Sequence, residues 1–173
     1  ALEHMKTTSF AEPSLDAVDH YNRYEEDIRL MADAGLNAYR FSIEWARIEP
    51  QEGVFDEKEL EHYRAVIRCC KEHGIEPKLH CLVYDQWSPK WVPRDDAWAV
   101  RQLLEKRIGQ IAERYRDTIP SMEVTNETVH RTSNPTKFFE EPDMVEWSFA
   151  RARAHLPTTR LIINEATQYI WKK

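Results

Sequence analysis

The fold of this chain is decided by one segment, AYRFSIEW at residues 38–45. Its even-numbered positions hold small or polar residues, and its odd-numbered positions hold large apolar residues. This period of two predicts a β-strand, placed at 36–45, with one face packed on helices and the other facing a wet, functional centre. The strand expected at 75–84 repeats the pattern, and its wet face holds Lys78, His80, Leu82 and Tyr84.

Helical and extended patterns alternate outward from this segment. Further extended segments lie at 121–127 and 160–165, and residues 6–10 are expected to form a short leading strand. Such alternation predicts an α/β fold with a parallel sheet, either Rossmann-type or a (β/α)8 barrel, and the polar strand faces favour the barrel. Apolar residues recur at helical spacing in four segments, at about 16–34, 56–74, 93–115 and 142–156.

Composition excludes several classes of function. The 173 residues are 31% charged and 42% hydrophobic, with a formal charge of −6. No apolar run approaches the roughly 20 residues of a membrane span, and no basic cluster suits nucleic acid, so neither partner is expected. The four glycines form no phosphate-binding loop, and no metal-ligand motif such as HExxH occurs, so we expect no cofactor and no metal.

The cysteines and the chain start predict the compartment. Three cysteines form no disulfide framework, and no secretory signal peptide stands at the start, so we expect a reducing, cytoplasmic location. Residues 1–5 are interpreted as a remnant of recombinant expression, which leaves 6–173 as a single domain.

Polar residues gather where the expected strands end. Parallel α/β folds place their sites at the carboxyl ends of strands, because the loops converge there. The sequence therefore predicts a functional site at this edge of the sheet. Its candidate residues are Arg40, His80, Tyr84, Asp85, Asn126, Glu127, Asn164 and Glu165.

Glu127 is the leading candidate for chemistry. A carboxylate on a rigid strand end can act as a general acid/base if burial raises its pKa toward neutrality, and the alternative is a carboxylate that caps the following loop. Glu165 follows the next strand in the same way, and it too is either a candidate second carboxylate or a loop cap.

The remaining candidates each have a structural alternative. Arg40 can hold a carboxylate by a bidentate contact or form a structural ion pair. His80 suits a sugar contact or a hydrogen-bonded place in the core. Trp87 and Trp91, in the loop after 75–84, suit stacking on the apolar faces of sugars or packing under that loop.

Two motifs in the first half are specific enough to indicate a family. They are DHYNRYEEDI at 19–28 and GLNAYRFSIEWARIEP at 35–50. Residues 19–77 thereby resemble family 1 glycoside hydrolases, the β-glucosidase-like enzymes.

The second half carries a different set of motifs. They are HCLVY at 80–84, QWSPKW at 86–91, EVTNE at 123–127 and LIINE at 161–165. Residues 78–171 thereby resemble family 10 glycoside hydrolases, the xylanases. The two resemblances together imply a chimera, engineered from two retaining glycosidases on (β/α)8 barrels, with a family 1-like half at 6–77 and a family 10-like half at 78–173.

The resemblances imply roles for individual residues. Glu127 matches the acid/base, and Asn126 matches the neighbour that contacts the sugar 2-hydroxyl. Arg40 matches the arginine that supports the nucleophile, and His80 matches a strand histidine near the sugar. Tyr84 stands where family 10 commonly has tryptophan and Asp85 where it commonly has histidine, and these two departures put a xylan-type subsite in doubt.

A missing strand limits the expected activity. Retaining hydrolysis needs a second carboxylate about 5–5.5 Å from the first, and both families place it on the seventh strand. The chain resembles only about strands 1/2 to 5, so we expect a partial (β/α)8 TIM barrel that is weakly active or inactive alone. The alternatives are an active retaining glycosidase acting on β-linked glucosides or xylans, and a sugar-binding module without turnover. Open sheet edges predict a homo-oligomer or a complementary barrel fragment as partner, beside a β-linked sugar.

Overall fold

A parallel sheet forms the centre of the protein. The computed structural model describes residues 17–85, 88–128 and 135–165. The described sheet has four strands in the order β1-β2-β3-β4, so each crossover carries the chain to the neighbouring strand. The strands are β1 (Ala38–Phe41), β2 (Glu76–Leu79), β3 (Ser121–Asn126) and β4 (Arg160–Asn164).

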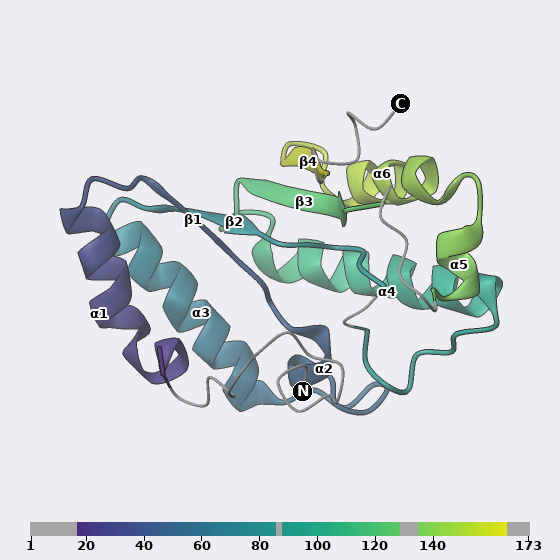
Figure 1. Cartoon of the computed structure of the whole chain (residues 1–173), viewed down its shortest axis with the longest axis horizontal. Helices are drawn as coiled ribbons and strands as arrows, with labels where there is room; N and C mark the ends of the chain where they lie inside the picture. Colours follow the sequence, from purple (N-terminus) through teal and green to yellow (C-terminus); the bar gives the residue numbers. More distant parts are fainter. Residues whose placement is uncertain (1–16, 86–87, 129–134, 166–173) are drawn as a thin grey trace.

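Helices separate the strands along the chain. Four long helices are α1 (His20–Asp33), α3 (Glu57–Glu72), α4 (Ala97–Tyr115) and α6 (Met144–His155), and two single turns are α2 (Trp45–Ile48) and α5 (Lys137–Glu140). Figure 1 shows α1 and α3 beside the β1 end of the sheet, with α4 and α6 beside the β4 end. The predicted α/β alternation with a parallel sheet and four long helices is therefore confirmed.

The observed elements are shorter than the sequence predicts. The segment expected as a strand at 36–45 pairs only over β1, because the chain turns into α2 at Trp45. After β2 the chain contacts β3 through single backbone bonds, from Leu82 N to Glu123 O at 2.8 Å and from Val83 N to Val124 O at 2.9 Å. The leading strand expected at 6–10 and the segment 1–5 lie outside the described residues.

The residues that flank α3 explain where this helix begins and ends. The Asp56 side chain accepts hydrogen bonds from the backbone N–H groups of Lys58 and Glu59, at 2.9 and 3.2 Å, and so satisfies two donors that a helix start leaves unpaired. Gly74 has a φ of +70°, the left-handed conformation that turns the chain toward β2. The helix expected at about 56–74 is therefore observed as α3, with Asp56 at its start and Gly74 just after its end.

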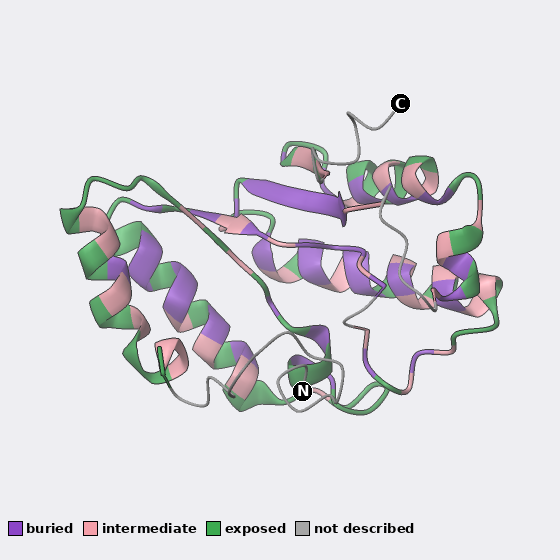
Figure 2. Cartoon of the chain, viewed as in Figure 1, coloured by how far each residue is buried: buried purple, intermediate pink, exposed green. Residues whose placement is uncertain are grey.

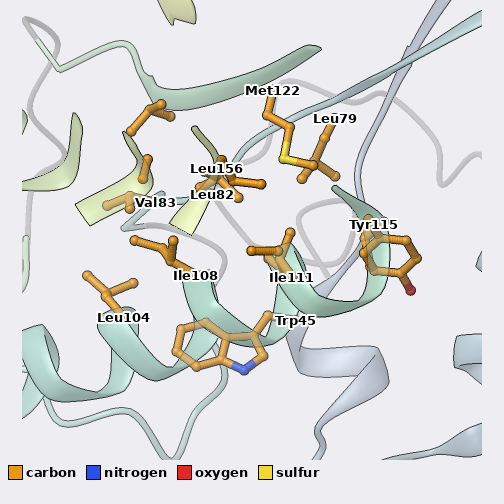
Figure 3. Packing of buried hydrophobic residues seen from close by; sticks show 14 of the residues in the cluster. Trp45, Leu79, Leu82, Val83, Leu104, Ile108, Ile111, Tyr115, Met122 and Leu156 are labelled. Carbon is orange, nitrogen blue, oxygen red and sulfur yellow. The ribbon is translucent and has the colours of Figure 1, made fainter. Parts of the chain in front are cut away.

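The main core lies between the sheet and α4. Figure 3 shows Leu104, Ile108 and Ile111 on α4 facing Leu82 and Val83. All five side chains are at most 3% exposed, and burial of each contributes about 1.5–3 kcal/mol relative to exposure in water. The core therefore fixes α4 against the segment that leaves β2, which is the segment that carries His80 and Tyr84.

A second cluster joins α1 to the rest of the molecule. Ile28 of α1 is fully buried against Val66 and Cys70 of α3 and against Ile75. Figure 2 shows β3 buried along its length, whereas much of the α1 surface is exposed. The β1 end of the sheet is therefore covered less completely than its centre.

A bulge interrupts the pairing of β3 with β4. Glu123 pairs with Ile162 and Thr125 pairs with Ile163, so Val124 is an extra residue in β3. In a regular strand, residues three apart face opposite sides of the sheet. The extra residue cancels that alternation and brings Asn126 to the same side as Glu123. The bulge therefore aims the end of β3 at the functional edge.

Candidate functional site

A cavity of about 740 Å³ lies over the carboxyl ends of the strands. Six of the sequence-predicted residues line it, namely Arg40, His80, Tyr84, Asn126, Glu127 and Asn164. The structure thus brings together residues from β1, the segment after β2, and the end of β3. Another hollow, of about 540 Å³, lies around Gly74 and Pro120 at the amino ends of the strands, where this type of fold does not place catalysis.

The lower part of the cavity is an ion network that we call the floor cluster. It consists of Arg40, Lys78, His80 and Glu123. Arg40 donates from Nε to both Glu123 carboxylate oxygens, at 2.9 and 3.0 Å, and from Nη2 at 2.9 Å. Lys78 Nζ lies 2.6 Å from Oε1, and His80 Nδ1 lies 2.6 Å from Oε2. Both oxygens of Glu123 are therefore engaged.

The network keeps Glu123 ionised. Burial alone raises the pKa of this carboxyl, since its side chain is 0% exposed, but hydrogen bonds from Arg40, Lys78 and His80 outweigh burial and lower its pKa to about 2. A group with that pKa holds no proton to give at neutral pH. Glu123 is therefore a fixed negative charge in the floor cluster and is unsuited to general acid catalysis.

The floor cluster also sets the tautomer of His80. Burial lowers the pKa of His80, and the hydrogen bond to Glu123 opposes that shift only in part, so the imidazole is neutral at pH 7. Because Nδ1 faces the carboxylate, Nδ1 carries the proton and Nε2 is an acceptor. The 2.8 Å approach of Arg40 Nη2 to Nδ1 is then a contact between two donors rather than a hydrogen bond.

The upper part of the cavity is formed by the ends of β3 and β4, and we call Asn126, Glu127 and Asn164 the rim. Asn164 Nδ2 donates to Asn126 Oδ1 at 2.6 Å, which leaves the Asn126 amide N–H groups as donors. Glu127 has a φ of +51°, a left-handed conformation that costs a non-glycine residue about 1–2 kcal/mol. Its backbone N–H donates to Asn164 O at 2.8 Å, which holds the strained residue in place.

Strain at Glu127 is informative because such conformations cluster at functional sites. Within the part of the chain that the structure describes, no hydrogen bond or ion pair engages the Glu127 carboxylate. The charge of Glu127 nonetheless lies close enough to His80 to oppose, in small part, the lowering of the imidazole pKa by burial. A carboxylate on strained backbone, facing a cavity, is thus available to a ligand.

Glu165 takes a different position from Glu127. Its Oε1 accepts hydrogen bonds from the Thr128 backbone N–H at 2.9 Å and from the Thr128 hydroxyl. The side chain is not among the residues that line the cavity. This geometry is that of the loop-capping alternative, and a role for Glu165 as second carboxylate stays a prediction.

Of the two candidate tryptophans, only Trp91 lies within the described residues. Trp91 donates from Nε1 to the Glu49 backbone oxygen at 3.0 Å and packs edge to face on Trp45, with ring centroids 5.4 Å apart. It does not line the cavity. Trp87 lies outside the described residues. Sugar stacking by either residue therefore stays a prediction.

One wall of the cavity contains a buried arginine that sequence analysis missed. Arg107 of α4 is 6% exposed, donates to the Leu82 backbone oxygen at 3.3 Å, and lies with its guanidinium 4.7 Å from the Trp45 ring centroid. Burial lowers its pKa to about 10, so it remains charged at neutral pH.

Cys81 also lines the cavity. Burial raises the pKa of its thiol to about 12, which rules out a thiolate nucleophile.

Two general features bear on function. Among the described residues, no group of three or more His, Cys, Asp or Glu side chains is arranged to hold a metal ion. Over the same ranges, no helix has the length and apolar character needed to cross a membrane.

Comparison with known proteins identifies close sequence relatives over part of the chain. The sequence profile described as "Glycosyl hydrolase family 1" matches residues 2–139. "Beta-glucosidase 25" from Oryza sativa subsp. japonica is 47% identical over 94 residues, which span 54% of this chain and 16% of the relative. The family 1 match runs past the expected junction at 77/78, so the chimera and its division into halves stay predictions.

Solved structures resemble the chain over most of its length. A beta-glycosidase structure, BGL167, has a TM-score of 0.71 and 31% identity over 95% of this chain and 50% of its own. An endo-1,4-beta-xylanase from Caldicellulosiruptor owensensis has a TM-score of 0.61 and 20% identity over 75% of this chain and 43% of its own, a likeness of fold alone. The chain thus spans half the length of the first structure, and the predicted partial (β/α)8 barrel is confirmed.

Proposed function

Because the chain belongs to glycosyl hydrolase family 1, we propose that its cavity binds a β-linked sugar and that Glu127 is the acid/base carboxylate of the site. We further propose that the 173-residue chain is weakly active or inactive alone. The observation that carries the proposal is the strained carboxylate of Glu127 at the end of β3, which is unengaged within the described ranges, whereas Glu123 in the floor cluster is bound on both oxygens.

The rim offers the hydrogen-bonding groups that a sugar requires. Asn164 holds the oxygen of Asn126, so the amide N–H groups of Asn126 can donate to a hydroxyl. His80, as the Nδ1–H tautomer, offers Nε2 as an acceptor. Tyr84 adds an aromatic ring, 5.9 Å from the His80 ring between centroids. Donors, an acceptor and an aromatic face together suit a neutral, polyhydroxylated ligand better than an ionic one.

The carboxylates of the cavity argue against efficient hydrolysis by one copy. Retaining hydrolysis needs a nucleophile beside the acid/base. Besides Glu127, the described lining contains Glu44 and Glu123. Glu123 is bound on both oxygens, and Glu44 forms an exposed ion pair with Arg47 at 3.1 Å. Neither is a free nucleophile, so efficient turnover needs a carboxylate from elsewhere.

A second candidate function is an active retaining glycosidase with Glu165 as nucleophile. The observation in its favour is that Glu165 binds Thr128, the residue directly after Glu127. The same contact opposes it, because the bound oxygen is already an acceptor of two hydrogen bonds. Glu127-dependent hydrolysis that disappears in Glu165→Gln would replace the first proposal with this one.

The family 10 character of the second half belongs to this proposal as well. It is supported by the sequence motifs at 80–91 and 123–127, and it places xylose-based sugars beside glucosides as ligands. A chimeric, engineered origin would account for both the family 10 motifs and the family 1 match. Tighter binding of xylobiose than of a matched glucoside would support it, and a clear preference for the glucoside would oppose it.

Ligand titration followed by NMR tests the proposed function. We expect saturable shifts in the Asn126 and His80 signals with methyl β-glucoside or xylobiose, and about 10- to 150-fold weaker binding in Glu127→Gln, because a hydrogen bond to a charged group contributes about 1.5–3 kcal/mol. Glu52→Gln, at an exposed turn outside the cavity lining, is the matched control and should bind as the parent does. Absence of saturable shifts, or equal loss in both variants, would contradict the proposal.

A further inference from the structure

The wall of the cavity contains a buried arginine whose charge is unpaired within the described part of the protein. Arg107 of α4 is 6% exposed and lines the cavity beside Leu104 and Cys81. Its Nε donates to the Leu82 backbone oxygen at 3.3 Å, and no acceptor in the described ranges engages Nη1 or Nη2. Burial of a charge without a partner is costly, so a ligand anion that reaches Arg107 would relieve that cost.

The acidic group that stabilises the Arg107 guanidinium is bound elsewhere. Cys81, Glu49 and Tyr115 all favour the charged guanidinium, but burial raises the pKa of the thiol and of the phenol, so only Glu49 carries a charge at neutral pH. One oxygen of Glu49 accepts from Trp45 Nε1 at 2.6 Å, and the other accepts from a backbone N–H at 2.8 Å. The Nη groups of Arg107 therefore remain available to a further acceptor.

The opposite side of Arg107 offers too little space to satisfy those donors. There Arg107 borders a hollow of about 10 Å³ together with Tyr115, whose buried hydroxyl has no hydrogen-bond partner within the described ranges. A hollow of this size holds about one water molecule. One water cannot accept from both Nη groups and also serve the Tyr115 hydroxyl, so the main cavity is the side from which a larger acceptor can reach Arg107.

Apolar and aromatic side chains surround the guanidinium. The Trp45 ring centroid lies 4.7 Å from the guanidinium carbon of Arg107. Ile43, Leu82 and Leu104 line the same cavity, and each is at most 3% exposed. A guanidinium beside an aromatic ring keeps its in-plane donors, and two parallel N–H groups match the two oxygens of a carboxylate. The wall therefore combines one cation with an apolar surround.

One class of ligand fits both properties of this wall. We propose that the wall is a binding site for an apolar carboxylate, such as an arylcarboxylate, whose oxygens accept hydrogen bonds from Arg107 and whose hydrocarbon body packs on Leu104 and Ile43. A single positive charge suits a carboxylate better than a phosphate dianion, which would bring a second negative charge into an apolar surround. The site uses no residue of the rim, and the proposal does not depend on sugar binding.

Titration of the parent protein with sodium benzoate, followed by NMR at constant ionic strength, tests the proposed site. Between about 0.1 and 20 mM benzoate, we expect saturable shifts of the Arg107 Nε–H and Trp45 indole N–H signals. Benzamide has nearly the same shape without the charge. It should bind at least about tenfold more weakly, because hydrogen bonds to an ionised acceptor are about twice as strong as neutral ones.

Substitutions on α4 assign the binding to one side chain. Arg107→Met removes the guanidinium but keeps an apolar stem, and it should weaken benzoate binding at least about tenfold. Arg107→Lys keeps the charge without the paired donors, so its affinity should fall between those of the parent and Arg107→Met. Arg114→Met is the matched control, because Arg114 belongs to the same helix and lies outside the described cavity lining, and it should bind benzoate as the parent does.

Three results would overturn the carboxylate site. Equal affinities for benzoate and benzamide would show that the charge of the ligand is not recognised. Benzoate binding that is unchanged in a folded Arg107→Met, as judged by circular dichroism, would place the anion at Arg40 or Lys78, the other cationic side chains of the described lining. Absence of saturable shifts at Arg107 and Trp45 in the parent would contradict the proposal without any substitution, so the test does not require that the variant folds.

Discussion

The floor cluster and the rim of the cavity each contain a glutamate, and the two glutamates have opposite surroundings. In the floor cluster, Glu123 is fully buried and each carboxylate oxygen has a cationic or imidazole partner. At the rim, Glu127 occupies left-handed backbone, and its carboxylate is unengaged within the described ranges. Both are glutamates of the same strand segment, four residues apart. Their difference shows that burial and bound partners, rather than residue type, decide which glutamate is structural and which is available for chemistry.

The largest expected effect comes from removing the floor carboxylate. Glu123→Ala leaves Arg40 and Lys78 facing each other without their shared anion, and breaking a buried ion pair costs about 3–5 kcal/mol. We expect a loss of about 4 kcal/mol in the free energy of unfolding by urea. Glu127→Ala is the matched control and should change that free energy by less than about 0.5 kcal/mol.

Equal losses in the free energy of unfolding of the two alanine variants would contradict the proposed difference between the floor cluster and the rim. A loss below about 1 kcal/mol in Glu123→Ala would show that the network contributes little to stability.

The second effect is the pH dependence of stability. The pKa of Glu123 is lowered from 4.5 to about 2, so the unfolded state binds more protons than the folded state between these values. The stabilisation is therefore fully present above pH 4.5 and is lost as pH falls through about 2, and it amounts to about 3 kcal/mol for a buried group. Urea titrations at pH 5 and pH 2.5 measure it. Glu123→Ala should lack this component, and a parallel pH dependence in parent and variant would oppose the assignment.

The smallest effect comes from relieving strain at the rim. Glu127→Gly replaces a left-handed glutamate by a residue that adopts a φ of +51° freely. Relief of about 1–2 kcal/mol is offset by the greater entropy of glycine in the unfolded chain, so we expect a net gain of about 0.5–1 kcal/mol. Thermal unfolding beside Glu127→Ala, which keeps the strain, isolates the backbone contribution. A less stable glycine variant would indicate that the conformation is not strained.

Much of the fold followed from patterns in the sequence. The alternation at 38–45 and the helical spacing along the chain predicted the four described strands and four long helices, because burial of one face imposes these periods. The expected strands extend past the observed ones where the chain keeps only single backbone hydrogen bonds to its neighbours, as after Leu79. Pairing depends on the partner strand, which local sequence does not contain.

The site was predictable in part. The positions of residues at strand ends correctly predicted six residues that line the cavity, namely Arg40, His80, Tyr84, Asn126, Glu127 and Asn164. Glu123 was missed because it lies within a strand, although a charge in a buried strand is a signal that could have found it. Arg107 was missed because it occupies a helical position, and the bulge at Val124 depends on the register with β4.

Hydrolysis of aryl β-glucoside and aryl β-xylobioside by the parent chain and by Glu127→Gln tests the central claim most directly. The claim is that Glu127 is a competent acid/base without a free partner carboxylate in the same cavity. The account predicts rates for the two proteins that agree within about twofold, near the uncatalysed rate, because a single carboxylate cannot complete retaining hydrolysis. A parent rate about 100-fold or more above that of Glu127→Gln would contradict it and would show that a second carboxylate completes the site.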